Sequence, residues 1–292
     1  MERPLVSAVI TTCKRPAETV ARALRSVLAQ TYSPIEIFII DDSPADYPER
    51  TKVAAYMADR QGIVYLQNEK NSGACFSRNR GLSLAGGKYV AFLDDDDEWL
   101  PEKIEKAVAT LEASDAKMVY SFAKQYRDDT GEWLPDCGRA FTGDFYSELL
   151  HTTNFIGGVS FPVLEREALL AIGGFDTEME SAQDFDLWLR MAKNYPVVCV
   201  GEPLTVYHWH SGEQISRNPK KKISGITRIL EKNADYFAEH PADLPPYQNA
   251  LAKYYAMDGQ KAKARSMWRK SVRGRPFALK ENLRVWKWIL KK

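Results

Sequence analysis

The sequence predicts an α/β fold with a mainly parallel central sheet and a C-terminal α-helical extension. Short apolar runs alternate with segments of helical periodicity through the first third of the chain. The apolar runs are hydrophobic at nearly every position, which is typical of strands buried on both faces of a parallel sheet. The chain has 292 residues, 45% of them hydrophobic, which is enough to build a sizeable core.

Four strands and three helices are expected before residue 94. The predicted strands are residues 5–10, 35–40, 63–67 and 89–93, and the predicted helices are 18–30, 47–60 and 74–85. In the first helix, Val20, Leu24, Val27 and Leu28 recur on one face. This β-α-β-α-β-α-β order is typical of a parallel sheet covered by helices on both faces.

The middle of the chain continues the alternation with less regular spacing. We expect helices at 103–111 and 165–172, strands at 118–123, 155–161, 197–200 and 203–209, and an irregular loop at 133–142. A strongly amphipathic helix opens near Ser181, because Leu187, Trp188 and Met191 fall on one buried face.

Charge divides the chain into two parts although its net charge is only +1. Residues 215–292 carry 19 Lys and Arg against 6 Asp and Glu, whereas the remainder carries 21 against 33. We therefore predict two domains, 1–216 and 217–292. In the second, helices are expected at 223–237 and 248–255, with a proline-rich linker at 241–246. Residues 251–272 resemble one tetratricopeptide-type helix pair, which must pack on the preceding helices.

The last residues form an amphipathic pattern with two interpretations. Leu279, Leu283, Trp286 and Leu290 recur at helical spacing among basic residues. The stripe either packs on the N-terminal domain or makes a peripheral contact between residues 279–292 and an anionic membrane. The sequence has no run of about 18 apolar residues and no apolar N-terminal signal. The spacing of its four cysteines indicates neither a metal site nor a disulfide framework, so we expect a cytoplasmic protein. We expect no nucleic acid partner.

Four consecutive carboxylates, residues 94–97, follow the fourth predicted strand. Adjacent carboxylates repel one another, and hard oxygen ligands suit Mg²⁺ or Mn²⁺. The ends of strands in open α/β sheets are also where ligands bind. The alternative is a solvated acidic turn before the helix that follows Pro101.

Polar side chains also follow the first two strands. Thr11 and Arg15 suit a phosphate or a base edge, and Asp42 can accept hydrogen bonds from a ribose or a base. The alternative for Asp42 is an Asx turn before Pro44. No G-x-G-x-x-G follows the first strand and no P-loop occurs, so a metal is the expected substitute for a glycine cradle.

Together these stretches resemble an inverting family 2 glycosyltransferase with the GT-A fold, a nucleotide-binding sandwich. The resemblance covers about residues 4–216 and rests on seven motifs in order: 6–16, 39–43, 73–81, 92–97, 173–176, 183–190 and 207–210. It implies a metal-dependent, hexosyltransferase-type enzyme that takes a sugar from a nucleotide diphosphate sugar, most simply a UDP-sugar. The acceptor would be a glycan or a lipid-linked molecule in cell-surface polysaccharide synthesis at the inner face of the membrane.

The resemblance also implies roles for individual residues. Asp42 would bind the base, and Arg78 would lie near the nucleotide. Asp94 and Asp95 would lie near the ribose and the metal, with Asp96 as the principal metal carboxylate. Asp184 would be the catalytic base, and His210 would approach the metal or the diphosphate. By its local sequence alone, Asp184 is better explained as an acid of a helix first turn, stabilised by the helix dipole.

Two other functions remain open at this stage. One is a non-catalytic subunit that binds sugar nucleotides or polysaccharide, and the other is a metal-dependent nucleotidyltransferase. Asp96 and Asp184 argue against the first, and the missing glycine-rich loop argues against the second.

Overall fold

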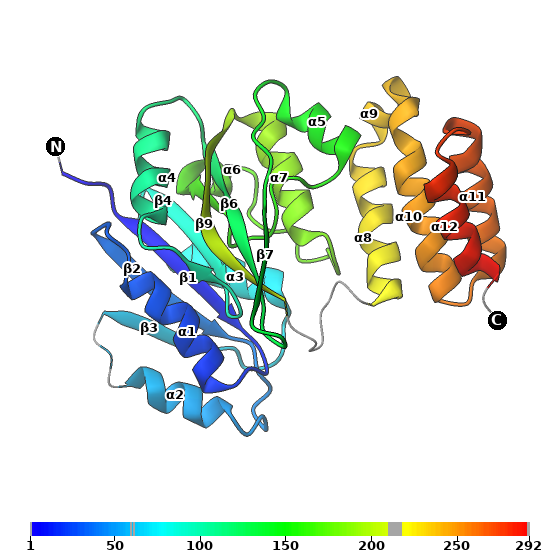
Figure 1. Ribbon diagram of the computed structural model, residues 1–292. Helices are drawn as coiled ribbons and strands as arrows, with labels where there is room; N and C mark the ends of the chain where they lie inside the picture. Colours follow the sequence, from blue (N-terminus) through cyan, green and yellow to red (C-terminus); the bar gives the residue numbers. More distant parts are fainter. Residues whose placement is uncertain (1, 59, 61, 210–217, 291–292) are drawn as a thin grey trace. The chain divides into compact units, whose positions relative to one another are not determined.

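The computed structural model describes residues 2–58, 60, 62–209 and 218–290. The chain forms two compact units (Figure 1). Unit 1 comprises Met1–Thr177 and Asp184–Ser211, and unit 2 comprises Glu178–Gln183 and Gly212–Lys292. The boundary at residue 216 lies outside the described residues and stays a prediction. The short segment of unit 2 that precedes Asp184 was not expected from the sequence.

Unit 1 is built on one sheet that has nine strands among the described residues, in the order β3-β2-β1-β4-β8-β6-β9-β5, with β7 paired to β6 (Figure 1). The strands are β1 (Val6–Thr12), β2 (Ile35–Asp41), β3 (Ile63–Gln67), β4 (Tyr89–Asp94), β5 (Glu98–Trp99), β6 (Met118–Arg127), β7 (Glu132–Cys137), β8 (Pro162–Glu165) and β9 (Val197–Trp209). The first four pair in parallel. β8 runs antiparallel to both β4 and β6, while β6 and β9 are parallel. The predicted α/β fold with a mainly parallel sheet is confirmed.

The helices before Tyr195 are α1 (Ala17–Leu28), α2 (Arg50–Ala58), α3 (Ala74–Leu84), α4 (Lys103–Glu112), α5 (Phe145–Thr152), α6 (Arg166–Ala171) and α7 (Gln183–Asn194). Side chains of β1 alternate between two helical layers. Ala8 and Ile10 share a buried cluster with residues of α1 and α4. Val9 points the other way and lies so close to Gly81 of α3 that a Cβ there would be 2.3 Å from Val9 Cγ1. The sheet is therefore covered on both faces, as its apolar strands require.

The direction in which successive strands are added to the sheet reverses at β1. The strands that follow β1 in sequence are added on its β2 side, and the chain then crosses to place β4 on the other side. Such a reversal leaves a crevice at the carboxyl ends of the strands. Thr11 and Asp94 are paired at this end of β1 and β4, so the acidic run begins at this edge of the sheet.

Two expectations for the middle of the chain are wrong, and one helix was missed. Residues 155–161 form an irregular loop, and the strand, β8, begins only at Pro162. Residues expected to be a loop include β7, which forms a hairpin with β6. α5 was not predicted, although its capping residue Asp144 accepts a hydrogen bond from the backbone amide of Ser147 at 3.1 Å.

Unit 2 is helical: α8 (Pro219–Lys232), α9 (Ala234–Glu239), the 3₁₀ helix η2 (Pro241–Asp243), α10 (Leu244–Met257), α11 (Lys261–Gly274) and α12 (Leu279–Leu290). The expected linker at 241–246 is instead η2 and the start of α10, because proline is tolerated in the first turn of a helix. Gly259, with φ of +78°, turns the chain between α10 and α11. α10 packs against α8, α11 and α12.

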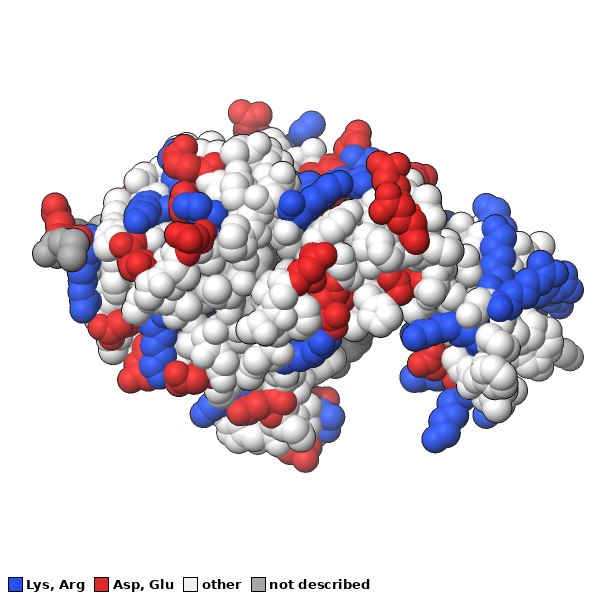
Figure 2. Space-filling view, turned by 90° about the horizontal axis from the view of Figure 1, so that it is seen from above, with Lys and Arg blue, Asp and Glu red and all other residues white. Residues whose placement is uncertain are grey.

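Two further properties concern the hydrophobicity of the helices and the charge of the surface. No helix among the described residues combines the length and the apolar character that crossing a bilayer requires. Among the charged side chains of unit 2 that are visible in Figure 2, Lys and Arg prevail, whereas both signs are mixed over unit 1.

Candidate active site

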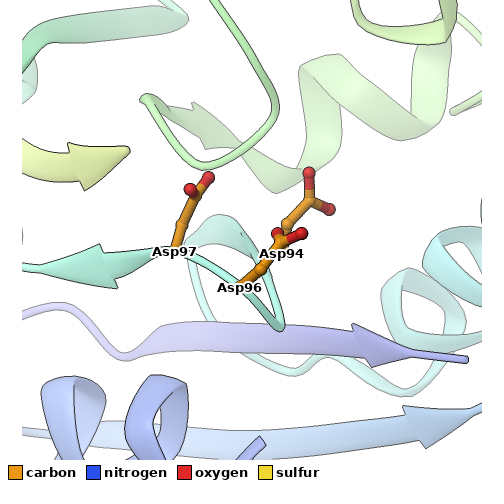
Figure 3. A group of neighbouring side chains, drawn as sticks. All are labelled: Asp94, Asp96 and Asp97. Atoms are coloured by element: carbon orange, nitrogen blue, oxygen red, sulfur yellow. The ribbon is translucent and has the colours of Figure 1, made fainter. Parts of the chain in front are cut away.

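A tight acidic turn follows β4. The backbone amide of Asp97 donates to the carbonyl oxygen of Asp94 at 3.1 Å, which folds residues 94–97 back on themselves. Carboxylate oxygens of Asp94, Asp96 and Asp97 consequently lie within 4.8 Å of one another. In Figure 3 the three side chains point to the same side of the turn. We call these three residues the acidic trio.

The acidic trio fits a divalent cation by its chemistry. Asp97 is 3% exposed, and this burial, together with the charges of Asp96 and Asp94, holds the pKa of the Asp97 carboxyl well above its usual value. A bound cation offsets the repulsion among carboxylates that lie this close together. Carboxylate oxygens are ligands that suit Mg²⁺ and Mn²⁺. The metal ligands expected from the sequence were Asp94, Asp96 and His210. Asp97 joins two of them in the structure, and His210 lies outside the described residues.

Asp95, in the same turn, points elsewhere. Its Oδ1 accepts a hydrogen bond from Arg15 Nε at 3.1 Å, and Arg15 Nη2 lies 2.6 Å from Asp96 Oδ2. Burial and the charge of Asp96 raise the pKa of Asp95 to about 7, against the opposing effect of Arg15. Arg15 therefore bridges the acidic trio to Asp95 and supplies positive charge beyond the carboxyl end of β1.

The carboxylate of Asp42 is engaged by the loop that leads into α3. Oδ1 accepts from Asn68 Nδ2 at 2.7 Å and from the amide of Ser72 at 2.8 Å, and Oδ2 accepts from the amide of Gly73 at 2.8 Å. Backbone amides at the start of a helix lack hydrogen-bond acceptors within the helix. The carboxylate of Asp42 serves as the acceptor for two amides at the start of α3. These bonds hold the start of α3 against the end of β2. The binding of a base by Asp42 stays a prediction.

Arg78 links α3 to the acidic trio. Its Nη2 donates to Asp94 Oδ1 at 2.7 Å, and its guanidinium lies 5.4 Å from the centre of the Phe175 ring. Burial alone would lower the pKa of Arg78, but the neighbouring carboxylates, chiefly Asp94 and also Asp184, raise it above its usual value. The carboxylates of Asp94 and Asp184 thus both contribute to the raised pKa of this buried guanidinium.

Asp184 lies in the first turn of α7 and is held by a loop residue. Asn154 Nδ2 donates to Asp184 Oδ2 at 3.0 Å. Asn154 also bonds both to the amide and to the carbonyl of Gly157, and Trp188 Nε1 donates to the same carbonyl at 2.9 Å. The carboxylate is therefore oriented by a loop that α7 itself supports.

Gly157 explains why the loop at 155–161 is not a strand. Its φ is +102°, and a Cβ there would lie 2.3 Å from Phe161 Cδ2. Only glycine meets both conditions without strain. The sequence showed the glycines but not the partner Asn154, whose bond to Asp184 spans 30 positions in the chain.

Both ring nitrogens of His208 are paired with carboxylates outside the acidic trio. Its ring nitrogens lie 2.6 Å from Asp128 Oδ1 and 2.8 Å from Glu98 Oε1, and the ring is 5% exposed. Only its backbone amide approaches the trio, at 3.4 Å from Asp97 Oδ1. The side chain of His208 therefore acts in the packing of β9 against β5.

Ser160, which sequence reasoning missed, connects two members of the trio. Its hydroxyl accepts a hydrogen bond from the backbone amide of Asp94 at 3.0 Å and also bonds the carboxyl of Asp97, which lowers the pKa of that carboxyl. The residue is completely buried. Because residues that support metal ligands tune affinity, Ser160 is a positioning residue for the trio.

We expect Ser160→Ala to weaken Mn²⁺ binding by about tenfold or more, because Asp97 loses a donor and one support of its orientation. The carbonyl of Ser160 keeps its bonds from Trp99 and Thr205, so the fold should persist. Calorimetric titration with Mn²⁺ measures the change. Ser121→Ala is a matched control, since Ser121 is buried as well but contacts Lys103 instead. Unchanged Mn²⁺ affinity in Ser160→Ala would show that the serine only fills space.

Comparison with known proteins gives consistent results. The model of the family described as glycosyl transferase family 2 matches residues 7–169. The chain is 34% identical over 244 residues to the putative colanic acid biosynthesis glycosyl transferase WcaA of Escherichia coli K12, covering 80% of this chain and 83% of that protein.

Two further matches extend this comparison. The UDP-Glc:alpha-D-GlcNAc-diphosphoundecaprenol beta-1,3-glucosyltransferase WfaP of Escherichia coli is 27% identical over 245 residues, covering 78% of this chain and 86% of that protein. The structure of Staphylococcus aureus TarS residues 1–349 in complex with UDP-GlcNAc superposes with a TM-score of 0.61 at 16% identity, covering 92% of this chain and 88% of that one. The likeness to TarS supports the fold.

Proposed function

Because the chain belongs to glycosyl transferase family 2, it is a glycosyltransferase, and we propose that it transfers a sugar with inversion from a nucleotide diphosphate sugar to a hydroxyl acceptor. The observation that carries this proposal is the position of Arg78. Its guanidinium donates a hydrogen bond to Asp94 of the acidic trio. The charge of Asp184 is one of the causes that raise the pKa of Arg78. The hydrogen bond ties Arg78 to the acidic trio, and the contribution of Asp184 to its raised pKa supports our proposal that the base and the diphosphate site belong to one active site.

In this mechanism Asp184 accepts the proton of the acceptor hydroxyl as that oxygen attacks the anomeric carbon. Asn154 fixes the direction of the Asp184 carboxylate, and the first turn of α7 favours its ionised form. General base catalysis of this kind contributes about 10²–10⁴-fold to a rate.

Cationic groups on the other side of the reacting centre stabilise the departing diphosphate. Arg15 and Arg78 place two guanidinium groups beside the acidic turn. The acidic trio would hold Mn²⁺ or Mg²⁺, which offsets negative charge on the leaving group when bound. Thr11, at the end of β1, would line the floor of the nucleotide site. Fixed charges of this kind favour charge that develops in the transition state.

The relatives guide the choice of donor and acceptor. WfaP is named for a UDP-glucose donor and a diphosphoundecaprenol-linked acceptor, and WcaA for colanic acid biosynthesis. An amylovoran biosynthesis glycosyltransferase of Erwinia amylovora is 28% identical over 217 residues. A UDP-sugar donor and a lipid-linked glycan acceptor are therefore our proposal, with the enzyme acting at the cytoplasmic face of the membrane.

A panel of nucleotide diphosphate sugars, each tested for nucleoside diphosphate release with Mn²⁺ and a lipid-linked acceptor, tests this function. We expect one UDP-sugar to stand out, with transfer of the labelled sugar to the acceptor and inverted linkage by NMR. A nucleotidyltransferase would instead release pyrophosphate from a nucleoside triphosphate, and a binding subunit would bind the donor without turnover. Either of those results would overturn the proposal.

A further inference from the structure

α12 is anchored in unit 2 by one face of its surface. Val285 and Ile289 are buried in a cluster with Ala252 and Ala264 of the two preceding helices. Trp286 lies against Trp268, with ring centres 4.5 Å apart. The helix is therefore a packed part of the helical unit, and its other face is turned away from this cluster.

That other face carries large apolar side chains. Leu279, Leu283 and Leu290 are 64%, 59% and 59% exposed, and Phe277 just before the helix is 93% exposed. The three leucines recur at helical spacing and form one stripe. The sequence predicted a single stripe that included Trp286, but the structure turns Trp286 to the packed side. We call Phe277 and the three leucines the outer face of α12.

Basic residues are frequent on α12 and on the segment that precedes it. Residues 261–290 contain ten Lys and Arg and a single acidic residue, Glu281. All ten basic residues are exposed. Lys280, Arg284 and Lys287 lie on α12 itself, next to the leucines. Figure 2 shows the resulting concentration of positive side chains on unit 2.

We propose that the outer face of α12 docks on an anionic lipid bilayer, with the helix lying in the plane of the interface. A helix that presents apolar side chains flanked by Lys and Arg binds such a surface by burying the apolar groups below the phosphates. The basic groups then lie at the level of the headgroups, where anionic lipids attract them. No described helix is able to span the bilayer, so the attachment is peripheral.

Charge and composition favour a bilayer over other occupants. A second copy that met the same face would bring Lys280, Arg284 and Lys287 of one α12 against the same three residues of the other. A soluble polyanion would use the basic residues but leave the leucines and Phe277 in water. An anionic lipid surface accommodates both the charges and the apolar side chains. This inference does not depend on the donor, the acceptor or the catalytic residues proposed above.

Sedimentation of the full chain with phosphatidylcholine vesicles, with and without phosphatidylglycerol, tests the proposal. We expect binding to the anionic vesicles at low salt and its loss at high salt. Leu283→Ser should lower the partition about tenfold. Lys280→Gln should lower it about fivefold. Leu28→Ser, a change at a leucine that is 52% exposed on α1, is the matched control and should bind as the wild type does.

Three results would overturn the proposal. The first is a chain that stays in the supernatant with anionic vesicles at low salt. The second is a loss of binding in Lys280→Gln but not in Leu283→Ser, which would indicate a contact by charge alone. The third is concentration-dependent self-association in light scattering that Leu283→Ser abolishes while vesicle binding persists, which would assign the outer face to a second copy.

Discussion

Asp184→Asn should lower kcat by about 10²–10⁴-fold while leaving donor affinity nearly unchanged. Asparagine keeps the shape of the side chain and an oxygen for the bond from Asn154, but it cannot take a proton. The expected loss corresponds to about 3–5 kcal/mol of transition-state stabilisation. Steady-state kinetics with the donor found in the panel, together with calorimetric titration of nucleoside diphosphate, separates turnover from binding.

Asp186→Asn provides a control on the same helix. Asp186 is buried and pairs with Arg190, whose Nε lies 2.8 Å from Asp186 Oδ2, so its replacement should reduce the free energy of unfolding by about 1–3 kcal/mol. Its turnover at low temperature should remain close to that of the wild type. Wild-type turnover in Asp184→Asn, or equal losses in the two variants, would contradict the assignment of the base.

The parallel half of the sheet was predictable because a strand buried on both faces has a recognisable local sequence, with apolar residues at most positions. Strands with few polar residues, such as β1 and β2, are recognisable without any partner, and the helices between them carry clear periodicity. The loop at 155–161 was not predictable, because an apolar run of that length also suits a strand. Its actual conformation depends on the positive φ of Gly157 and on hydrogen bonds that Asn154 and Gly157 make with Asp184 and Trp188 of α7, which are tertiary contacts.

Part of the candidate site was likewise predictable from the sequence, and part was not. The run of four carboxylates is visible in any reading of the sequence, and so is the acid at the start of α7. The direction in which each carboxylate points is decided by the turn. That turn sends Asp95 to Arg15 and brings Asp97 to the trio, a choice that four identical neighbours cannot reveal. Ser160 was equally hidden, since it lies in a loop and its partners Asp94, Trp99 and Thr205 come from three different strands.

Asp96→Asn should weaken Mn²⁺ binding by about 100-fold or more and should remove cation-dependent donor binding. The substitution takes one negative charge from three carboxylates that lie within 4.8 Å of one another. Loss of a ligand should exceed the roughly 10–100-fold effect of losing a residue that only supports one. Arg15 keeps its bond to Asp95, so the turn itself should survive. Calorimetric titration with Mn²⁺, and then with nucleoside diphosphate in the presence of Mn²⁺, measures both losses.

Asp95→Asn is the matched control, because it makes the same chemical change one residue earlier, at a carboxylate outside the acidic trio. Its Mn²⁺ affinity should remain within about tenfold of the wild type, since the lost charge is already balanced by Arg15. Equal losses in the two variants would show that the run acts only through its total charge. Full transfer activity of the wild type in excess chelator would show that the acidic trio serves the fold rather than a cation.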